Sequence, residues 1–162
     1  MLLRRAHGAP GPGRARRGDG SRGVLTPATP GSPAQEGLFT DGDAPRLLGG
    51  RCASCGRHHF PRHDTCPYCA AETCEPVELS PRGRLWAWTA VTSAPPGYRG
   101  EVPYGFGVVE LPEGLRVVTR LTEPDPARLA SGQPMAMVVV PVHTGDDGRP
   151  VVSYAFAPEE DQ

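Results

Sequence analysis

The sequence predicts a mainly β protein with two small folded units that follow a low-complexity N-terminal segment. Three observations carry this prediction: a double Cys-x-x-Cys pattern before the middle of the chain, five β-type segments after it, and a Gly- and Pro-rich stretch before it. The 162 residues suit one domain or two small ones. The formal net charge is only −1, so the charge of each segment is more informative than the total.

Residues 1–35 are predicted to be a disordered tail. Glycine and proline make up 12 of these 35 residues, above the roughly one-quarter content typical of low-complexity segments. The segment also carries six arginines and one acidic residue, so a basic arm for nucleic acid is the alternative interpretation. It contains no aromatic side chain to stack on bases, which favours the disordered tail.

Apolar runs are short throughout the chain. The longest covers residues 135–140, far below the roughly 18 residues of a membrane span. Arg4 and Arg5 follow the start, but the apolar core of a signal peptide does not come after them. Without a secretion signal, paired cysteines favour a metal over disulfides, because reducing compartments do not keep disulfides. We therefore expect a cytoplasmic protein that contacts no membrane.

Two Cys-x-x-Cys knuckles with ten residues between them predict a metal site formed by Cys52, Cys55, Cys66 and Cys69. Two residues between cysteines let both sulfurs turn toward one point, and two facing knuckles give the thiolate tetrahedron of a structural zinc ion. A single iron is the alternative metal, because four thiolates hold it equally well. We expect residues 36–74 to form a rubredoxin-like zinc ribbon around this site.

Protein sulfur fills all four positions of that site, so no open position remains for water or substrate, and the metal is expected to be structural. Because the site is complete, His58, His59 and His63 are interpreted as solvated or packing residues. Cys74 lies outside both knuckles and is expected to be a buried small side chain. Gly56 follows the first knuckle, whereas Ala70 follows the second, so we expect strain or a different turn at Ala70.

Residues 75–160 are predicted to form a five-stranded OB-fold barrel. Segments rich in β-branched and aromatic residues cover 85–91, 104–110, 115–121, 135–142 and 151–156, and residues 126–130 allow one helical turn. Five strands with a short helix between the third and the fourth is the order of an OB-fold. Gly83, Gly105 and Gly107 are expected where barrel strands bend or approach closely.

An OB-fold often binds single-stranded nucleic acid, and this is one alternative function. Residues 75–162 carry seven arginines and twelve acidic residues, whereas a barrel that neutralises phosphates should be basic. The aromatic residues Trp86, Trp88, Tyr104 and Phe106 alternate along strands, which is more typical of a core or an interface than of base stacking.

An enzyme acting alone is a further alternative. The sequence offers no Ser-His-Asp set, no pair of carboxylates in a catalytic context and no phosphate-binding loop. A rubredoxin-like electron carrier stays open as a further alternative.

The chain resembles a bacterial and archaeal family that joins a rubredoxin-like zinc ribbon to a C-terminal OB-fold. The resemblance covers about residues 36–160. It rests on Leu47-Leu48-Gly49, Cys52-x-x-Cys55-Gly56, His59-Phe60-Pro61, Cys66-Pro67-x-Cys69, Gly83-Arg84-Leu85-Trp86, Pro103-Tyr104-Gly105, Val109-Glu110-Leu111-Pro112-Glu113-Gly114 and Phe156-x-Pro158.

The resemblance implies a partner and not a chemistry of the chain's own. Members of the family act as accessory subunits of thiolase-like enzymes of the sterol-carrier-protein-x type, or of hot-dog-fold enoyl-CoA hydratases, in lipid, sterol or polyketide metabolism. The barrel then packs on the enzyme and helps to form the acyl-CoA channel. Tyr98 and Arg99, in a proline-rich loop, are the candidate acyl-CoA or partner contacts, and a solvated loop arginine is the alternative for Arg99.

Overall fold

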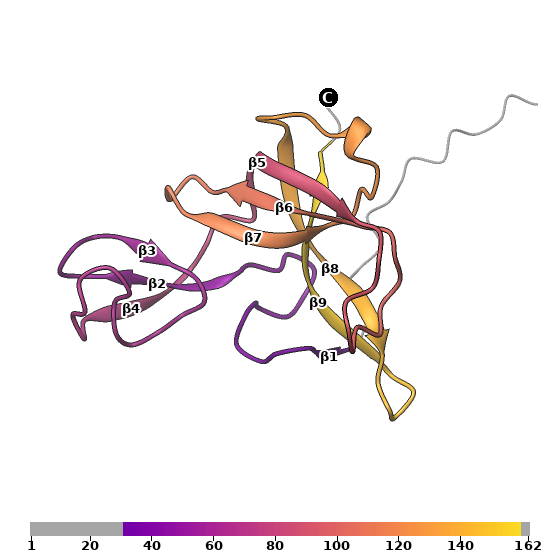
Figure 1. Ribbon diagram of the computed structural model, residues 1–162. Coiled ribbons are helices and arrows are strands. Elements are labelled where there is room, and N and C mark those ends of the chain that lie inside the picture. The colour runs from indigo at the N-terminus through magenta and orange to yellow at the C-terminus, as the bar shows by residue number, and fades with distance from the viewer. Residues whose placement is uncertain (1–30, 160–162) are drawn as a thin grey trace, which may run out of the picture.

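The computed structural model describes residues 31–159. It contains a barrel and, beside it, a smaller three-stranded sheet (Figure 1). Most of the predicted disordered tail, residues 1–30, lies outside the described residues. Across residues 31–159, no helix is long and apolar enough to cross a membrane.

The barrel consists of five strands and one 3-10 turn, as the β-type segments predicted. The elements are β5 (Arg82–Val91), β6 (Tyr104–Glu110), β7 (Arg116–Leu121), η1 (Pro126–Arg128), β8 (Pro134–Thr144) and β9 (Pro150–Pro158). β5, β6 and β7 form an antiparallel meander, β7 pairs in parallel with β9, and β8 pairs with both β9 and β5. These pairings close the five strands into a barrel, so the OB-fold prediction is confirmed.

The smaller sheet is the ribbon. Its strands are β2 (Leu48–Cys52), β3 (His58–His59) and β4 (Cys74–Glu78), in the order β3-β2-β4. β2 ends at the first cysteine of the first knuckle, and β4 begins shortly after the second knuckle at Cys74, which pairs with Cys52, so the two knuckles lie at one end of the sheet (Figure 1). β4 runs across the boundary that the sequence placed between residues 74 and 75.

Residues 31–35, which belong to the predicted tail, lie against the barrel. β1 (Ser32–Pro33) pairs in parallel with β9 at Val151 and Val152, and the Ala34 N–H donates to the Val152 carbonyl at 2.8 Å. β7 pairs with β9 at Ala155 and Phe156, and β1 pairs with the earlier part of the same strand. Residues 32–34 are therefore paired with the barrel sheet and are not disordered as predicted. Composition alone does not show that a sheet edge is available.

One apolar core fills the barrel and reaches toward the ribbon. Its fully or almost fully buried side chains include Leu47, Leu79, Leu85, Val109, Leu121, Met135 and Phe156. Leu47 directly precedes β2, and Leu79 directly follows β4, so both ends of the ribbon sheet are anchored in the barrel core. The rings of Phe60 and Tyr154 also meet edge to face across the junction, with centroids 5.4 Å apart. The ribbon is therefore packed on the barrel.

Two glycines show why the barrel strands can approach closely. A Cβ atom at Gly83 would lie 2.6 Å from the Glu110 carbonyl oxygen, and one at Gly107 would lie 2.6 Å from the Ala87 carbonyl oxygen. Real Cβ atoms do not come so near a backbone oxygen, so a larger residue at either position would push the strands apart. This confirms the close approach expected of these glycines.

Candidate metal centre and the aromatic surface of the barrel

The two knuckles have the same local geometry although their sequences differ. In the first, the Gly56 N–H donates to the Cys52 carbonyl at 2.8 Å, and in the second the Ala70 N–H donates to the Cys66 carbonyl at 3.0 Å. Gly56 has a φ of 72° and Ala70 a φ of 59°. Ala70 thus adopts the left-handed conformation that glycine takes easily and an L-residue adopts at a cost. The strain expected at this position is confirmed.

These turns bring the four predicted cysteine sulfurs together. The Sγ atoms of Cys52 and Cys69 are 3.7 Å apart, as are those of Cys55 and Cys66, and all four lie within 4.8 Å of one another. A tetrahedron with metal–sulfur bonds of about 2.3 Å has edges of about 3.8 Å. The cluster therefore has the size and donor set of a metal-binding site, and a zinc or iron ion fits it.

The thiols of the cluster differ in pKa. The backbone N–H of Cys55 is the main group that lowers the pKa of Cys52, to about 6, and further hydrogen bonds outweigh desolvation. The Ala71 N–H lowers the pKa of Cys69, but desolvation and the three neighbouring sulfurs raise it to about 12. Four thiolates this close repel one another, so a bound cation is needed before all of them ionise together.

The residues near the cluster have other contacts. Cys74 pairs with Cys52 across β2 and β4, and its pKa is raised to about 11, first by desolvation. It is partly and not fully buried. His59 is buried, with its Nε2 3.3 Å from the backbone nitrogen of His63 and 3.2 Å from its carbonyl oxygen. His59 is thus a packing residue that braces the loop between the knuckles.

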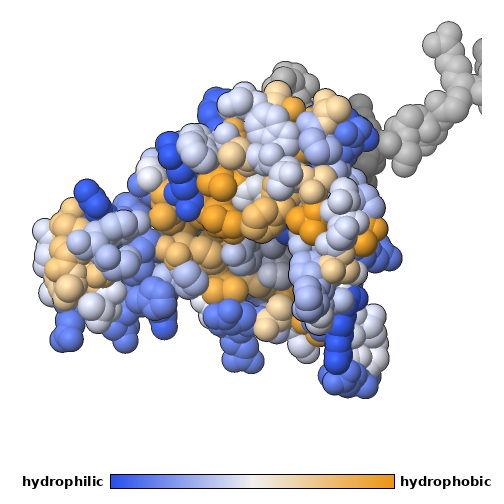
Figure 2. Space-filling view, viewed as in Figure 1, coloured by the Kyte–Doolittle hydropathy of each residue, from blue (hydrophilic) through white to orange (hydrophobic). Residues whose placement is uncertain are grey.

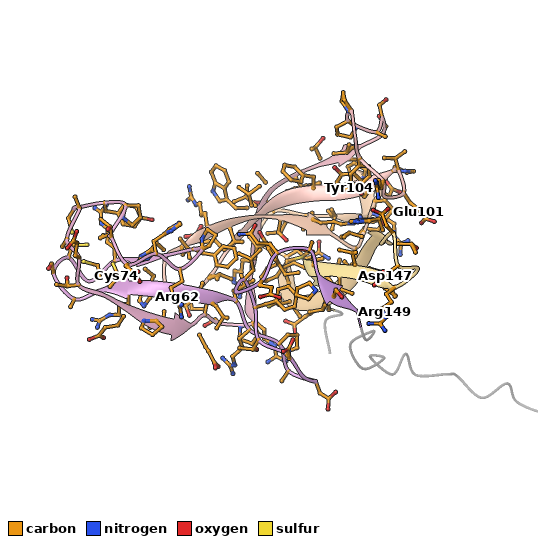
Figure 3. The ribbon with its side chains drawn as sticks, turned by 90° about the horizontal axis from the view of Figure 1, so that it is seen from below. Arg62, Cys74, Glu101, Tyr104, Asp147 and Arg149 are labelled. Carbon is orange, nitrogen blue, oxygen red and sulfur yellow. The ribbon has the colours of Figure 1, made fainter. Side chains whose placement is uncertain are left out.

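The proline-rich loop between β5 and β6 holds the predicted contact residues Tyr98 and Arg99. The Tyr98 hydroxyl accepts a hydrogen bond from Arg120 Nη1 at 3.0 Å, and the Arg120 guanidinium lies 4.8 Å from the centre of the Tyr104 ring. Arg99 forms an ion pair with Asp146 in the β8–β9 turn at 2.8 Å. In the view of Figure 3, Glu101, Tyr104 and Asp147 lie toward one end of the molecule, and Cys74 of the ribbon lies toward the other.

The two tryptophans of β5 point in different directions. Trp88 is half-buried, and its Nε1–H donates to the Pro126 carbonyl at 3.1 Å. Trp86 is 50% exposed, and the Arg116 guanidinium lies 4.1 Å from its ring centre. The pairing of β5 with β6 shifts register between Leu85 and Ala87, which sets the orientation of Trp86. The sequence placed both tryptophans in a core or an interface, and the structure divides them: Trp88 packs against the core, whereas Trp86 is exposed.

A groove of about 710 Å³ lies beside Trp86, between the start of β5, the β6–β7 turn and the start of β8. Its two arginines have partners within the protein. Arg82 Nε lies 2.8 Å from the Glu159 carboxylate, and Arg84 Nη1 donates to the Gly132 carbonyl at 2.9 Å. We assign no ligand to this groove.

The fold and the cysteine cluster define a class of protein in which a rubredoxin-like metal ribbon is joined to an OB-fold barrel. Residues 39–74 match the family described as "ChsH2, rubredoxin-like zinc ribbon domain". Residues 76–140 match "ChsH2, C-terminal OB-fold domain". The chain therefore belongs to the ChsH2 family of zinc-ribbon and OB-fold proteins, which confirms the resemblance seen in the sequence.

Relatives of this chain have names that refer to complexes. It is 38% identical over 116 residues to the "Benzoylsuccinyl-CoA thiolase subunit BbsA" of Thauera aromatica, covering 72% of this chain and 78% of the relative. It is 33% identical over 114 residues to a "DUF35 domain-containing scaffold protein" of Pyrococcus furiosus, covering 70% and 83%. The solved structure of an "Ltp2-ChsH2(DUF35) aldolase" is similar with a TM-score of 0.55 and 27% identity, covering 70% of this chain and 84% of that one.

Proposed function

We propose that this chain is a non-catalytic accessory subunit of a thiolase-like enzyme that acts on acyl-CoA thioesters. The observation that carries the proposal is the similarity to a thiolase subunit and to scaffold proteins across both the ribbon and the barrel. The chain would bind the enzyme and contribute to the acyl-CoA site, while the catalytic residues belong to the partner. An enoyl-CoA hydratase of the hot-dog fold is the second class of partner, and we expect the complex in the cytoplasm.

The metal has a structural role in this proposal. Cys52, Cys55, Cys66 and Cys69 would hold one zinc ion and leave no coordination position for a substrate. The bound ion would supply folding free energy to the ribbon and no reaction chemistry. Iron in the same site would make the purified protein red, so colour and metal analysis together distinguish zinc from iron.

The loop that carries Tyr98 and Arg99 is the proposed place of contact with acyl-CoA. Tyr98 is held against Arg120, and Arg99 against Asp146, so the loop has a defined position at one end of the barrel. A CoA phosphate would compete with the exposed Asp146 carboxylate for Arg99, which is feasible because exposed ion pairs are weak. Replacing Arg99 with Ala should then weaken acyl-CoA use by the complex and leave its metal content intact.

Co-expression tests the proposal. Each thiolase-like and hydratase-like protein of the native host is expressed with this chain, and the size of the product is measured by light scattering after gel filtration. One of these proteins should elute together with this chain at a constant ratio. Separate peaks in every case would contradict an accessory role.

A further inference from the structure

The outer side of the β5–β7 meander carries an exposed row of apolar and cationic side chains. We call it the outer barrel face, and it consists of Trp86, Phe106, Val108, Arg116, Val118 and Arg120. Phe106 and Val108 alternate along β6 with Gly105, Gly107 and Val109, which are buried. Trp86, Phe106 and Val118 are exposed by 50%, 40% and 55%. Figure 2 shows apolar residues gathered over β6 and β7, with hydrophilic residues around them.

Strand register makes these side chains one continuous surface. Val108 is opposite Val118, and Phe106 is opposite Arg120. Arg116 lies one step further along β7 and covers one side of the Trp86 ring. Successive side chains on one side of a strand are about 7 Å apart, so the row of Arg116, Val118 and Arg120 along β7 extends over about 14 Å. An exposed apolar surface of this kind on a folded protein marks an interaction site.

The charged residues of this face are arginines, whereas the net charge of residues 75–162 is negative. Residues 75–162 carry seven arginines and twelve acidic residues. On the outer barrel face, Arg116 and Arg120 flank Val118 on β7. Glu110 lies at one end and contacts Arg116 at 3.3 Å. Tryptophan and arginine around an apolar centre are typical of the energetically dominant residues of protein interfaces.

We propose that the outer barrel face is the docking surface for the partner enzyme, and that the partner presents an apolar patch bordered by carboxylates. The inference rests on the proposed accessory function and adds the surface that performs it. The apolar centre would receive Trp86 and Val118, and the partner's carboxylates would lie opposite Arg116 and Arg120. Because Arg120 also holds Tyr98, docking on this face would bring the proline-rich loop to the edge of the interface.

The ribbon offers a matched control residue. Tyr68 is 48% exposed, and the Arg57 guanidinium lies 5.1 Å from its ring centre, so it has nearly the exposure and the arginine contact of Trp86. It differs in its position, on the second knuckle and away from the outer barrel face. Trp86→Ala with Val118→Asp therefore tests the face, and Tyr68→Ala tests the loss of an exposed aromatic ring elsewhere.

The experiment measures the dissociation constant of the complex with the co-purifying thiolase-like or hydratase-like protein by calorimetry. The Trp86→Ala, Val118→Asp double variant should bind about tenfold or more weakly, whereas Tyr68→Ala should bind as the wild type does. Arg116→Glu should also weaken the complex and reduce its dependence on salt. Melting temperature and metal content confirm that each variant is folded.

Several results would overturn the docking surface. A complex that forms with wild-type affinity in the double variant leaves the accessory function intact and rejects this face. Loss of binding in Tyr68→Ala alone would place the interface on the ribbon. Salt-dependent binding of a single-stranded oligothymidine that Trp86→Ala abolishes would make the face a nucleic-acid site. A chain that binds none of the candidate enzymes rejects both the face and the accessory function.

Discussion

The barrel buries a row of large apolar side chains, whereas the ribbon buries few. Leu85, Val109, Leu121, Met135 and Phe156 come from all five barrel strands and are at most 1% exposed. In residues 36–78 of the ribbon, the buried side chains larger than glycine are Leu47, Cys52, His59 and Cys66. Leu47 belongs to the barrel core, and two of the others are proposed metal ligands. The barrel is thus stabilised by apolar burial, and we propose that the ribbon is stabilised by a bound metal and by the junction.

This difference follows from size. A unit of about 40 residues exposes too much of its surface to fold on an apolar core alone and usually needs a metal, a disulfide or a partner. The barrel is roughly twice as long and closes on itself, so its strands share one core. We therefore predict that the two units respond differently to the same kind of perturbation.

Removal of the metal should have the largest effect, and it should be confined to the ribbon. In the Cys52→Ser, Cys69→Ser double variant, the metal should be lost and the amides of β2, β3 and β4 should exchange hydrogen rapidly, because metal binding supplies folding free energy there. The barrel amides should keep their protection. Metal analysis and hydrogen exchange by mass spectrometry measure both effects.

Cys74 provides the control for that prediction, since it is a neighbouring cysteine outside the group of four. Cys74→Ser should retain the metal and the protection of the ribbon. Full metal retention in the double variant would contradict the assignment of these cysteines as metal ligands. Loss of barrel protection to the same extent as in the ribbon would show that the two units unfold together.

A cavity in the barrel should destabilise the barrel and leave the metal site of the ribbon intact. Phe156 is fully buried, so Phe156→Ala should lower the free energy of unfolding by about 3–5 kcal/mol while the metal content stays unchanged. Phe106→Ala removes the same ring from an exposed position and should cost about 1 kcal/mol or less. Denaturant unfolding followed by tryptophan fluorescence distinguishes them, and equal losses in both variants would contradict the core assignment.

The junction should show a smaller, pH-dependent effect. Glu113 Oε1 accepts hydrogen bonds from the Ser80 N–H and hydroxyl, each at 2.8 Å. Burial opposes ionisation of Glu113, but the Ser80 hydrogen bonds outweigh it and lower its pKa below the usual 4.5. Its contribution to stability is therefore present at neutral pH and is lost as the pH falls below about 4.5.

Glu113→Gln should accordingly lower the free energy of unfolding by about 0.5–1 kcal/mol at pH 7. The difference from the wild type should shrink at acid pH, where the native carboxyl is protonated too. Glu110→Gln, which removes an exposed ion pair with Arg116, should have almost no effect. Denaturant titrations across a pH series measure this, and a loss that is independent of pH would rule out the carboxylate as the cause.

The second knuckle should show the smallest change. Ala70 has a φ of 59°, and relief of this conformation in Ala70→Gly gains roughly 1–2 kcal/mol. The greater freedom of glycine in the unfolded chain offsets about 0.5–1 kcal/mol of that gain. The variant should release its metal slightly more slowly to a chelator, whereas Gly56→Ala should release it faster. Faster release from Ala70→Gly would show that the alanine is not strained.

Local sequence patterns were sufficient to predict the cysteine cluster, the turn at Ala70 and the barrel strands, because these features depend on residues close together in the chain. The Cys-x-x-Cys pairs determine where four sulfurs meet, and the alanine after the second knuckle indicated a strained turn. The barrel strands were visible as runs of β-branched and aromatic residues between turn signals. Glycines at positions of close strand approach were also identified from the strand pattern.

Features that depend on distant parts of the chain could not be predicted in this way. The pairing of β1 with β9 joins residues about 120 positions apart, and nothing in the composition of residues 31–35 specifies it. The register shift in β5 gives Trp86 and Trp88 different environments, although alternation alone treats them as equivalent. The partners of Tyr98 and Arg99 are Arg120 and Asp146, which only the closed barrel brings near the loop.

We propose that this chain supports a reaction without performing it. The most direct test is acyl-CoA turnover by the co-purifying enzyme, measured while this chain is added in increasing amounts. We predict no turnover by this chain alone, low turnover by the enzyme alone, and a rise to a plateau at the stoichiometry of the purified complex. Turnover by this chain alone, or an enzyme whose activity is the same with and without it, would contradict the claim.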